Sequence, residues 1–192
     1  MAEGLESEES RIIRRILRVN HSGEHGAVAI YSSQIDRARK NYPDILPWLE
    51  ETLKHELRHR ETFLTAMPSR GAKPCRAMLV WRSGGAMLGA ITAMFGKSGV
   101  MICTAAVERT VHRHLVEQID FLERADPELA VLVRDILREE DDHLEMAERH
   151  HNPDRTSARV LSSIVTCLTE IFIFLSTRGD SRKLHAMMHQ SS

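Results

Sequence analysis

An internal repeat with a fixed offset of 84 residues constrains the fold of this 192-residue chain more than any other feature. The two halves align without a gap, in the register Glu24/Glu108, Gln34/Gln118, Pro43/Pro127, Glu56/Glu140 and His59/His143. Apolar residues recur at helical spacing, and no alternating strand pattern persists. Each half is therefore predicted to be a helix, a proline-bearing turn and a second helix. Two such αα-hairpins, related by pseudosymmetry, can pack as an all-α four-helix bundle.

The apolar periodicity predicts six helices in one domain that spans residues 1–192. They cover residues 9–40, 45–67, 76–95, 99–124, 128–150 and 157–177. The repeat itself covers residues 24–61 and 108–145, and the first ten residues are expected to be disordered. Asp126-Pro127 is typical of an N-cap followed by proline at the first helical position. The length allows a sizeable core for a single domain.

Within each half, a glutamate precedes a Glu-x-x-His motif by 32 residues. Residues three apart lie on one helical face, so the Glu and His of each motif project toward the same point. One Glu from each of two helices, with Glu-x-x-His from each of two others, is the ligand pattern of two-metal sites in ferritin-like bundles. The candidate metal ligands, which are also the candidate catalytic residues, are Glu24, Glu56, His59, Glu108, Glu140 and His143.

A third Glu-x-x-His, at Glu148 and His151, is interpreted as chance spacing, because Leu64 and Met67 stand 84 residues earlier. The repeated ligand set also indicates the metal. Four carboxylates and two imidazoles suit iron or manganese, whereas a structural zinc site favours thiolates in closed tetrahedral geometry. Iron is the predicted metal, because this ligand set leaves open positions where dioxygen can bind.

Composition narrows the partners and the compartment. A formal net charge of −1 gives no overall attraction to nucleic acid, so none is expected as a partner. Three scattered cysteines without a Cys-x-x-Cys spacing indicate reduced thiols. The first ten residues contain four glutamates and no basic residue, unlike a signal or transit peptide. A bacterial protein on the cytoplasmic side, or a chain whose leader was removed, is expected.

Two apolar helices are predicted at residues 76–97 and 157–177. Within the first, the uncharged run covers only the 14 residues 83–96, fewer than the roughly 20 apolar residues of a membrane span, and Glu170 interrupts the second. They either lie on a membrane surface or belong to a buried core, and the residues alone leave both open. The arginine stripe at residues 11, 14, 15 and 18 could meet anionic headgroups, although such a stripe is more often a solvated face.

At these motifs the sequence resembles the demethoxyubiquinone hydroxylases of ubiquinone biosynthesis, a family of membrane-associated, ferritin-like di-iron monooxygenases. The similarity runs from about residue 11 to about residue 178. It is carried by the segments at residues 18–27, 56–59, 81–90, 103–108 and 139–143. Ser22, Ser33 and Thr166-Cys167 depart from the family's usual residues, and none of these is a candidate ligand.

The resemblance implies hydroxylation of a ring carbon of demethoxyubiquinol. It implies two iron ions per chain, dioxygen as co-substrate, and NADH or the quinol itself as reductant. His114, six residues after Glu108, lies near the ligand face, and the resemblance implies contact with the quinone head. Tyr31, seven residues after Glu24, is a candidate proton or electron relay. Core packing stays open for both. His21, His25, His55 and His112 have no assigned role.

Because a polyprenyl quinone lives in the bilayer, the resemblance favours membrane attachment of the two apolar helices. The expected place is the cytoplasmic face of a bacterial inner membrane, or the matrix face of the mitochondrial inner membrane. Expected partners are a polyprenyl quinol, the bilayer surface, and a second copy or an accessory protein of ubiquinone biosynthesis. Two alternatives stay open: a ferroxidase or peroxide-consuming di-manganese protein, and a quinone- or lipid-binding protein whose site is vestigial.

Overall fold

The computed structural model describes residues 7–150 and 156–176. Over those residues the fold contains α-helices and two short 3-10 turns but no strand, which confirms the all-α prediction. The helices are α1 (Glu8–Asn41), α2 (Leu46–Ala66), α3 (Met78–Ala93), α4 (Gly96–Ala125), α5 (Pro127–Arg149) and α6 (Thr156–Ser176). Each predicted helix is present, with ends that differ by at most three residues.

The helix ends follow local capping chemistry. The Ser7 hydroxyl accepts a hydrogen bond from the Ser10 amide, and an N-cap of this kind starts α1 at Glu8. The expected disorder of the first ten residues is therefore wrong for residues 8–10, while residues 1–6 lie outside the described part. Asp126 caps α5 as predicted, since its Oδ1 accepts from the Leu129 amide at 3.0 Å.

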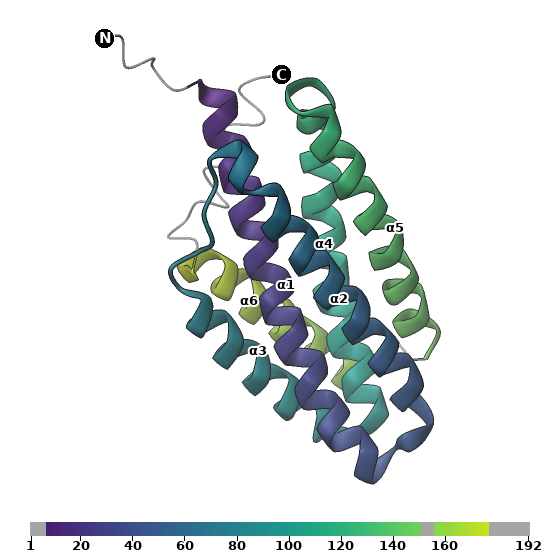
Figure 1. Ribbon diagram of the computed structural model, residues 1–192. Helices are drawn as coiled ribbons and strands as arrows, with labels where there is room; N and C mark the ends of the chain where they lie inside the picture. Colours follow the sequence, from purple (N-terminus) through teal and green to yellow (C-terminus); the bar gives the residue numbers. More distant parts are fainter. Residues whose placement is uncertain (1–6, 151–155, 177–192) are drawn as a thin grey trace, which may run out of the picture.

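The helices pack as two pairs, α1 with α2 and α4 with α5 (Figure 1). The pairs meet where α1 contacts α4 and α2 contacts α5. Outside them, α3 packs on α1, α6 packs on α4, and α3 also contacts α6. The lone glutamates stand on α1 and α4, and the Glu-x-x-His motifs stand on α2 and α5. Packing of the two pairs therefore turns all four ligand-bearing helices toward one interior.

Helix α3 approaches α1 almost backbone to backbone. A Cβ atom on Gly85 would lie 2.3 Å from the carbonyl oxygen of Gly26, and one on Gly89 would lie 2.3 Å from that of Ile30. No side chain fits at either position, so glycine is what permits this approach. A predicted apolar helix is thus fixed against the helix that carries Glu24.

Two apolar clusters bracket the middle of the molecule. One gathers Ile12, Ile16, Phe63, Leu122 and Leu129 from the four paired helices. The other gathers Tyr31, Ile35, Leu49, Met101 and Ala147 from the same four helices, toward the opposite end of each of them. The candidate ligands fall between these clusters in every helix, so apolar side chains separate the ligands from water at both ends.

Candidate metal centre

The structure brings all six candidate ligands together as two groups of buried side chains. Glu24, Glu56, His59 and Glu140 form the first group, and Glu56, Glu108, Glu140 and His143 form the second. In each group, one ligand atom per residue lies within 4.8 Å of the others. Glu56 and Glu140 belong to both groups. The arrangement is that of two neighbouring positions with two carboxylates between them, although the role of the six residues as ligands stays a prediction.

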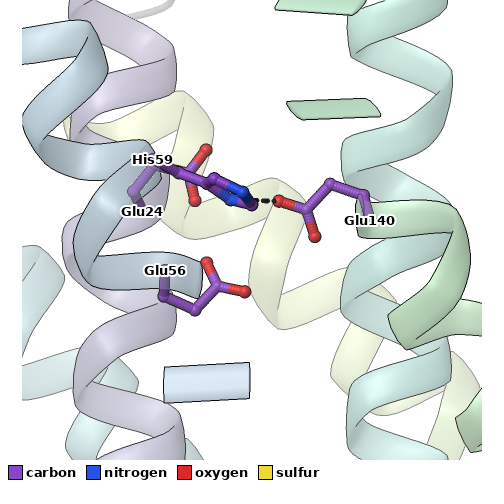
Figure 2. Close-up of side chains that lie close together, drawn as sticks. All are labelled: Glu24, Glu56, His59 and Glu140. Carbon is purple, nitrogen blue, oxygen red and sulfur yellow. Dashed lines mark ion pairs between the residues drawn. The ribbon is translucent and has the colours of Figure 1, made fainter. Parts of the chain in front are cut away.

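Both histidines turn the same ring nitrogen toward the shared carboxylates. His59 Nδ1 lies 3.0 Å from Glu140 Oε1, and Figure 2 shows Glu140 reaching across the interior toward His59, which lies on the same side as Glu24 and Glu56. His143 Nδ1 lies 3.2 Å from Glu140 Oε2 and 3.5 Å from Glu56 Oε1. The Nε2 atoms therefore face outward, which leaves them available to other partners.

Three of the four carboxyl groups have pKa values raised above the ordinary range of a glutamate. Burial, together with the charge of Glu140, raises the pKa of Glu24 to about 7. The same two causes raise the pKa values of Glu56 and Glu108 well above the ordinary range. A bound cation would replace these protons, because it stabilises the charged carboxylates that burial disfavours.

Glu140 differs from the other three. Burial opposes its ionisation, but contacts with His143 and His59 outweigh burial and lower the pKa of Glu140. Burial likewise opposes protonation of His59, yet Glu140 and Glu24 raise the pKa of His59 to about 9. Without a metal, the centre is therefore held by a buried carboxylate–imidazolium pair.

The residues present fit a metal ion. Three central atoms, Glu56 Oε1, Glu140 Oε1 and His59 Nδ1, have no hydrogen-bond partner among the described residues. Glu140 Oε1 and His59 Nδ1 are close together but are not aligned for a hydrogen bond. Leaving one buried polar atom unsatisfied costs about 1–3 kcal/mol. A cation would satisfy all three atoms, and carboxylate oxygens with imidazole nitrogens are donors that suit iron or manganese.

An apolar cavity of about 80 Å³ lies beside the metal centre. Glu24, Glu56, Glu108 and Glu140 border it at the centre, and side chains of α1, α3, α4 and α6 form its walls. Gly23 also lines it, at a place where a Cβ atom would meet nothing within 4 Å. The cavity gives an apolar molecule access to the ligands.

The two predicted substrate residues both lie at this site. The buried Tyr31 hydroxyl donates a hydrogen bond of 2.5 Å to Glu108 Oε1. Burial and the charge of Glu108 raise the pKa of Tyr31 well above its usual value, so the phenol keeps its proton. His114 lines the cavity, and its Nε2 lies 3.8 Å from Glu170 Oε1. Tyr31 therefore positions a candidate ligand, whereas His114 can reach a molecule in the cavity.

Two outer residues were missed from the sequence. Glu139 Oε2 lies 3.0 Å from His59 Nε2, and His55 Nδ1 lies 3.0 Å from His143 Nε2. His55 and Glu139 are themselves 84 residues apart, so the repeat could have identified them as a pair.

The remaining candidates lie away from the centre. Glu148 is exposed and forms an ion pair with Arg109 at 2.8 Å, while His151 lies outside the described residues. His112 is half-buried, and its Nε2 lies 3.2 Å from Asp141 Oδ1. The interpretation of the third Glu-x-x-His as chance spacing is consistent with the position of Glu148.

The fold and the site define an all-helical protein with a buried carboxylate–histidine centre beside an apolar cavity. The family described as ubiquinone biosynthesis protein COQ7 matches this chain over residues 11–176. The chain therefore belongs to this family, the demethoxyubiquinone hydroxylases, which are hydroxylating oxidoreductases.

Individual relatives agree with the family match. The chain is 34% identical over 170 residues to the mitochondrial NADPH-dependent 3-demethoxyubiquinone 3-hydroxylase of Homo sapiens, covering 86% of this chain and 77% of that protein. It is 30% identical over 167 residues to the 3-demethoxyubiquinol 3-hydroxylase of Rhodospirillum rubrum, covering 87% and 78%. The mitochondrial 5-demethoxyubiquinone hydroxylase of Saccharomyces cerevisiae is 27% identical over 192 residues, covering 92% and 82%.

Proposed function

We propose that this chain hydroxylates a ring carbon of demethoxyubiquinol, with dioxygen as co-substrate and two bound iron ions. One observation carries the proposal: two ligand groups share Glu56 and Glu140 at the border of an apolar cavity. Relatives named for the same ring hydroxylation support the substrate. A centre for a soluble ion or peroxide would not need this apolar access.

The proposed architecture is a ferritin-like four-helix bundle of α1, α2, α4 and α5, with α3 and α6 as additional helices. In this arrangement Glu24 and His59 hold one ion, Glu108 and His143 hold the other, and Glu56 with Glu140 lies between them. Two bound iron ions supply dioxygen activation, so that one oxygen atom enters the ring and the other leaves as water. NADH or the quinol itself is the proposed source of electrons.

The chain's own residues do three things in this reaction. The apolar cavity walls, which include Leu88 and Val107, orient the ring and exclude water. The Tyr31 hydroxyl holds Glu108 in place through its hydrogen bond. His114 is the proposed contact to a ring oxygen, since it is one of the few polar side chains on a largely apolar wall.

The outer faces of α3 and α6 are the proposed membrane contact. Leu79, Met94 and Phe95 are 66%, 68% and 63% exposed on α3 and the turn after it. Val160 and Ile164 of α6 are about half exposed. None of the described helices combines the length and sustained hydropathy that a membrane span requires. Attachment to one leaflet through these faces would let a polyprenyl quinol pass from the bilayer between α3 and α6, on the cytoplasmic or matrix side.

The test is the quinone content of cells that lack this protein. Accumulated demethoxyubiquinone, restored to ubiquinone by the wild-type chain, supports the proposal, and unchanged quinones would rule it out. Glu140→Ala should fail to restore ubiquinone, while Glu148→Ala on the same helix should restore it. Unchanged quinones with new sensitivity to iron or peroxide would instead indicate a ferroxidase or a peroxide-consuming enzyme.

A further inference from the structure

Each outward-facing histidine nitrogen meets a residue supplied by the other half of the repeat. The Nε2 of His59 in the first half faces Glu139 of the second half at 3.0 Å. The Nε2 of His143 in the second half faces His55 of the first half at 3.0 Å. His55 and Glu139 occupy equivalent repeat positions. The geometry is thus a crosswise exchange, but one partner is a carboxylate and the other is an imidazole.

The two partners act differently on the histidines they face. With a metal at Nδ1, the ring proton resides on Nε2, which donates it to the outer partner. A carboxylate acceptor makes the coordinating imidazole a stronger donor to the metal. A neutral imidazole acceptor does so more weakly, since it carries no charge. Arg58 forms an ion pair with Glu139, which holds this carboxylate in place and offsets part of its charge.

A second asymmetry points in the same direction. The Tyr31 hydroxyl donates to Glu108 Oε1, so part of the electron density of that carboxylate is engaged by a hydrogen bond. The repeat equivalent of Tyr31 is Leu115, whose side chain has no hydrogen-bond donor for Glu24. The second position thus has a weaker carboxylate as well as a weaker histidine.

We propose that the two metal positions are unequal, with the Glu24–His59 position binding its ion more tightly than the Glu108–His143 position. Glu139 and His55 are positioning residues that act through the histidines and set this order. The inference rests on the proposed two-metal function and deepens it. One ion stays bound while the other is the more easily lost.

The experiment is an anaerobic calorimetric titration of the metal-free, full-length chain with Fe²⁺. Two binding steps are expected, separated by about tenfold or more in affinity. Glu139→Gln should weaken the tighter step by about 10–100-fold and bring the two steps together. His55→Glu, which copies the second half's residue into the first, should strengthen the weaker step. Glu148→Gln removes a charge from the same helix outside the centre and should leave both steps unchanged.

Variants that lack one candidate histidine ligand show which Fe²⁺-binding step belongs to which metal position. His143→Ala should retain one tightly bound ion, and His59→Ala should retain only the weaker one. The side chains of His55 and Glu139 are partly exposed, at 27% and 32%. The Glu139→Gln and His55→Glu variants should therefore unfold, without metal, at the same temperature as the metal-free wild type. If Glu139 and His55 had a purely structural role, their variants would change the unfolding temperature and leave the difference between the two Fe²⁺ affinities unchanged.

Three results would overturn the inference. Equal affinities in the wild type would refute it, and so would a Glu139→Gln variant that weakens both steps alike. Either result leaves the proposed hydroxylase standing, since two ions are still bound. Absence of any Fe²⁺ binding would overturn the inference and the proposed function together.

Discussion

At the scale of single residues, the two shared carboxyl groups differ in how firmly they hold a proton. Contacts with His143 and His59 lower the pKa of Glu140, whereas burial and the charge of Glu140 raise the pKa of Glu56 well above its ordinary value, which favours protonated Glu56 when no metal is present. In the metal-bound protein the same side chain must be ionised to serve two positions. Metal binding at Glu56 therefore displaces the proton that burial favours.

Glu56→Gln separates these two states. Glutamine has nearly the shape of the protonated acid, so the free energy of unfolding of the metal-free protein should change little. Binding of iron should be severely weakened, because the amide cannot supply a charged oxygen to either position. Urea unfolding with and without Fe²⁺ checks both statements. A variant that still binds two ions with wild-type affinity would contradict the role of Glu56.

The sequence predicted the six candidate ligands because a repeat conserves which helical face a residue occupies. It did not predict the contacts of Glu139 with His59 or of Tyr31 with Glu108, because these cross from one half to the other. Such contacts depend on how the two hairpins pack, and sequence spacing within one helix contains no information about that. Even so, the equivalence of His55 and Glu139 was present in the repeat.

At the scale of helices, glycines have opposite roles on the two sides of one interface. Glycines recur in the apolar segment at residues 84, 85 and 89, and apolar periodicity alone does not predict what they contact. In the structure, Gly85 is where α3 touches the α1 backbone, whereas Gly23 of α1 faces the cavity. Gly85 and Gly23 differ because of how α3 packs on α1. Helix α3 lies outside the repeat, so the repeat could not predict its position.

Matched alanine substitutions should therefore change stability in opposite directions. Gly23→Ala should stabilise the protein by up to about 1 kcal/mol, because alanine favours a helix and its Cβ meets nothing within 4 Å. Gly85→Ala should destabilise it by about 1–3 kcal/mol, because the Cβ would lie 2.3 Å from the Gly26 carbonyl oxygen. Urea midpoints of the two variants test this. Equal effects would mean that α3 does not approach α1 so closely.

At the scale of the whole molecule, the centre has an apolar side and a polar side. The cavity opens among α1, α3, α4 and α6, while the outer partners His55 and Glu139 stand on α2 and α5. The repeat predicted the polar side, since both Glu-x-x-His helices belong to it. It could not predict the cavity, because two of its four walls come from helices without a repeat equivalent. Membrane attachment, a second copy and an accessory protein stay predictions.

Vesicle binding tests the proposed membrane face. The wild-type chain should sediment with phospholipid vesicles, and Met94→Glu combined with Phe95→Glu should reduce the bound fraction by at least about tenfold. Burial of one such side chain contributes about 1.5–3 kcal/mol, and both are more than 60% exposed in the protein. Val131→Glu, on α5, replaces a residue that is 51% exposed and should have no effect. Equal loss in both variants would argue against a specific face.

The protonation of the centre makes the stability of the metal-free protein depend on pH in a defined direction. Folding raises the pKa of Glu24 from 4.5 to about 7 and that of His59 from 6.5 to about 9. Between these values the folded protein binds more protons than the unfolded chain, so stability falls as pH rises. The raised pKa values of Glu56 and Glu108 add to this trend. The lowered pKa of Glu140 acts only below the ordinary glutamate value of 4.5, outside this window.

Metal-free protein should therefore be more stable to urea near pH 5.5 than near pH 8.5, with Glu24 alone contributing about 2 kcal/mol to the difference. Bound metal replaces the same protons, so the loaded protein should lose this dependence and become more stable as the ligands ionise. The crossing of the two stability curves is the expected signature of one buried cluster that exchanges protons for metal. A metal-free protein whose stability rises over this pH range would show that the carboxyl groups are already ionised without a cation.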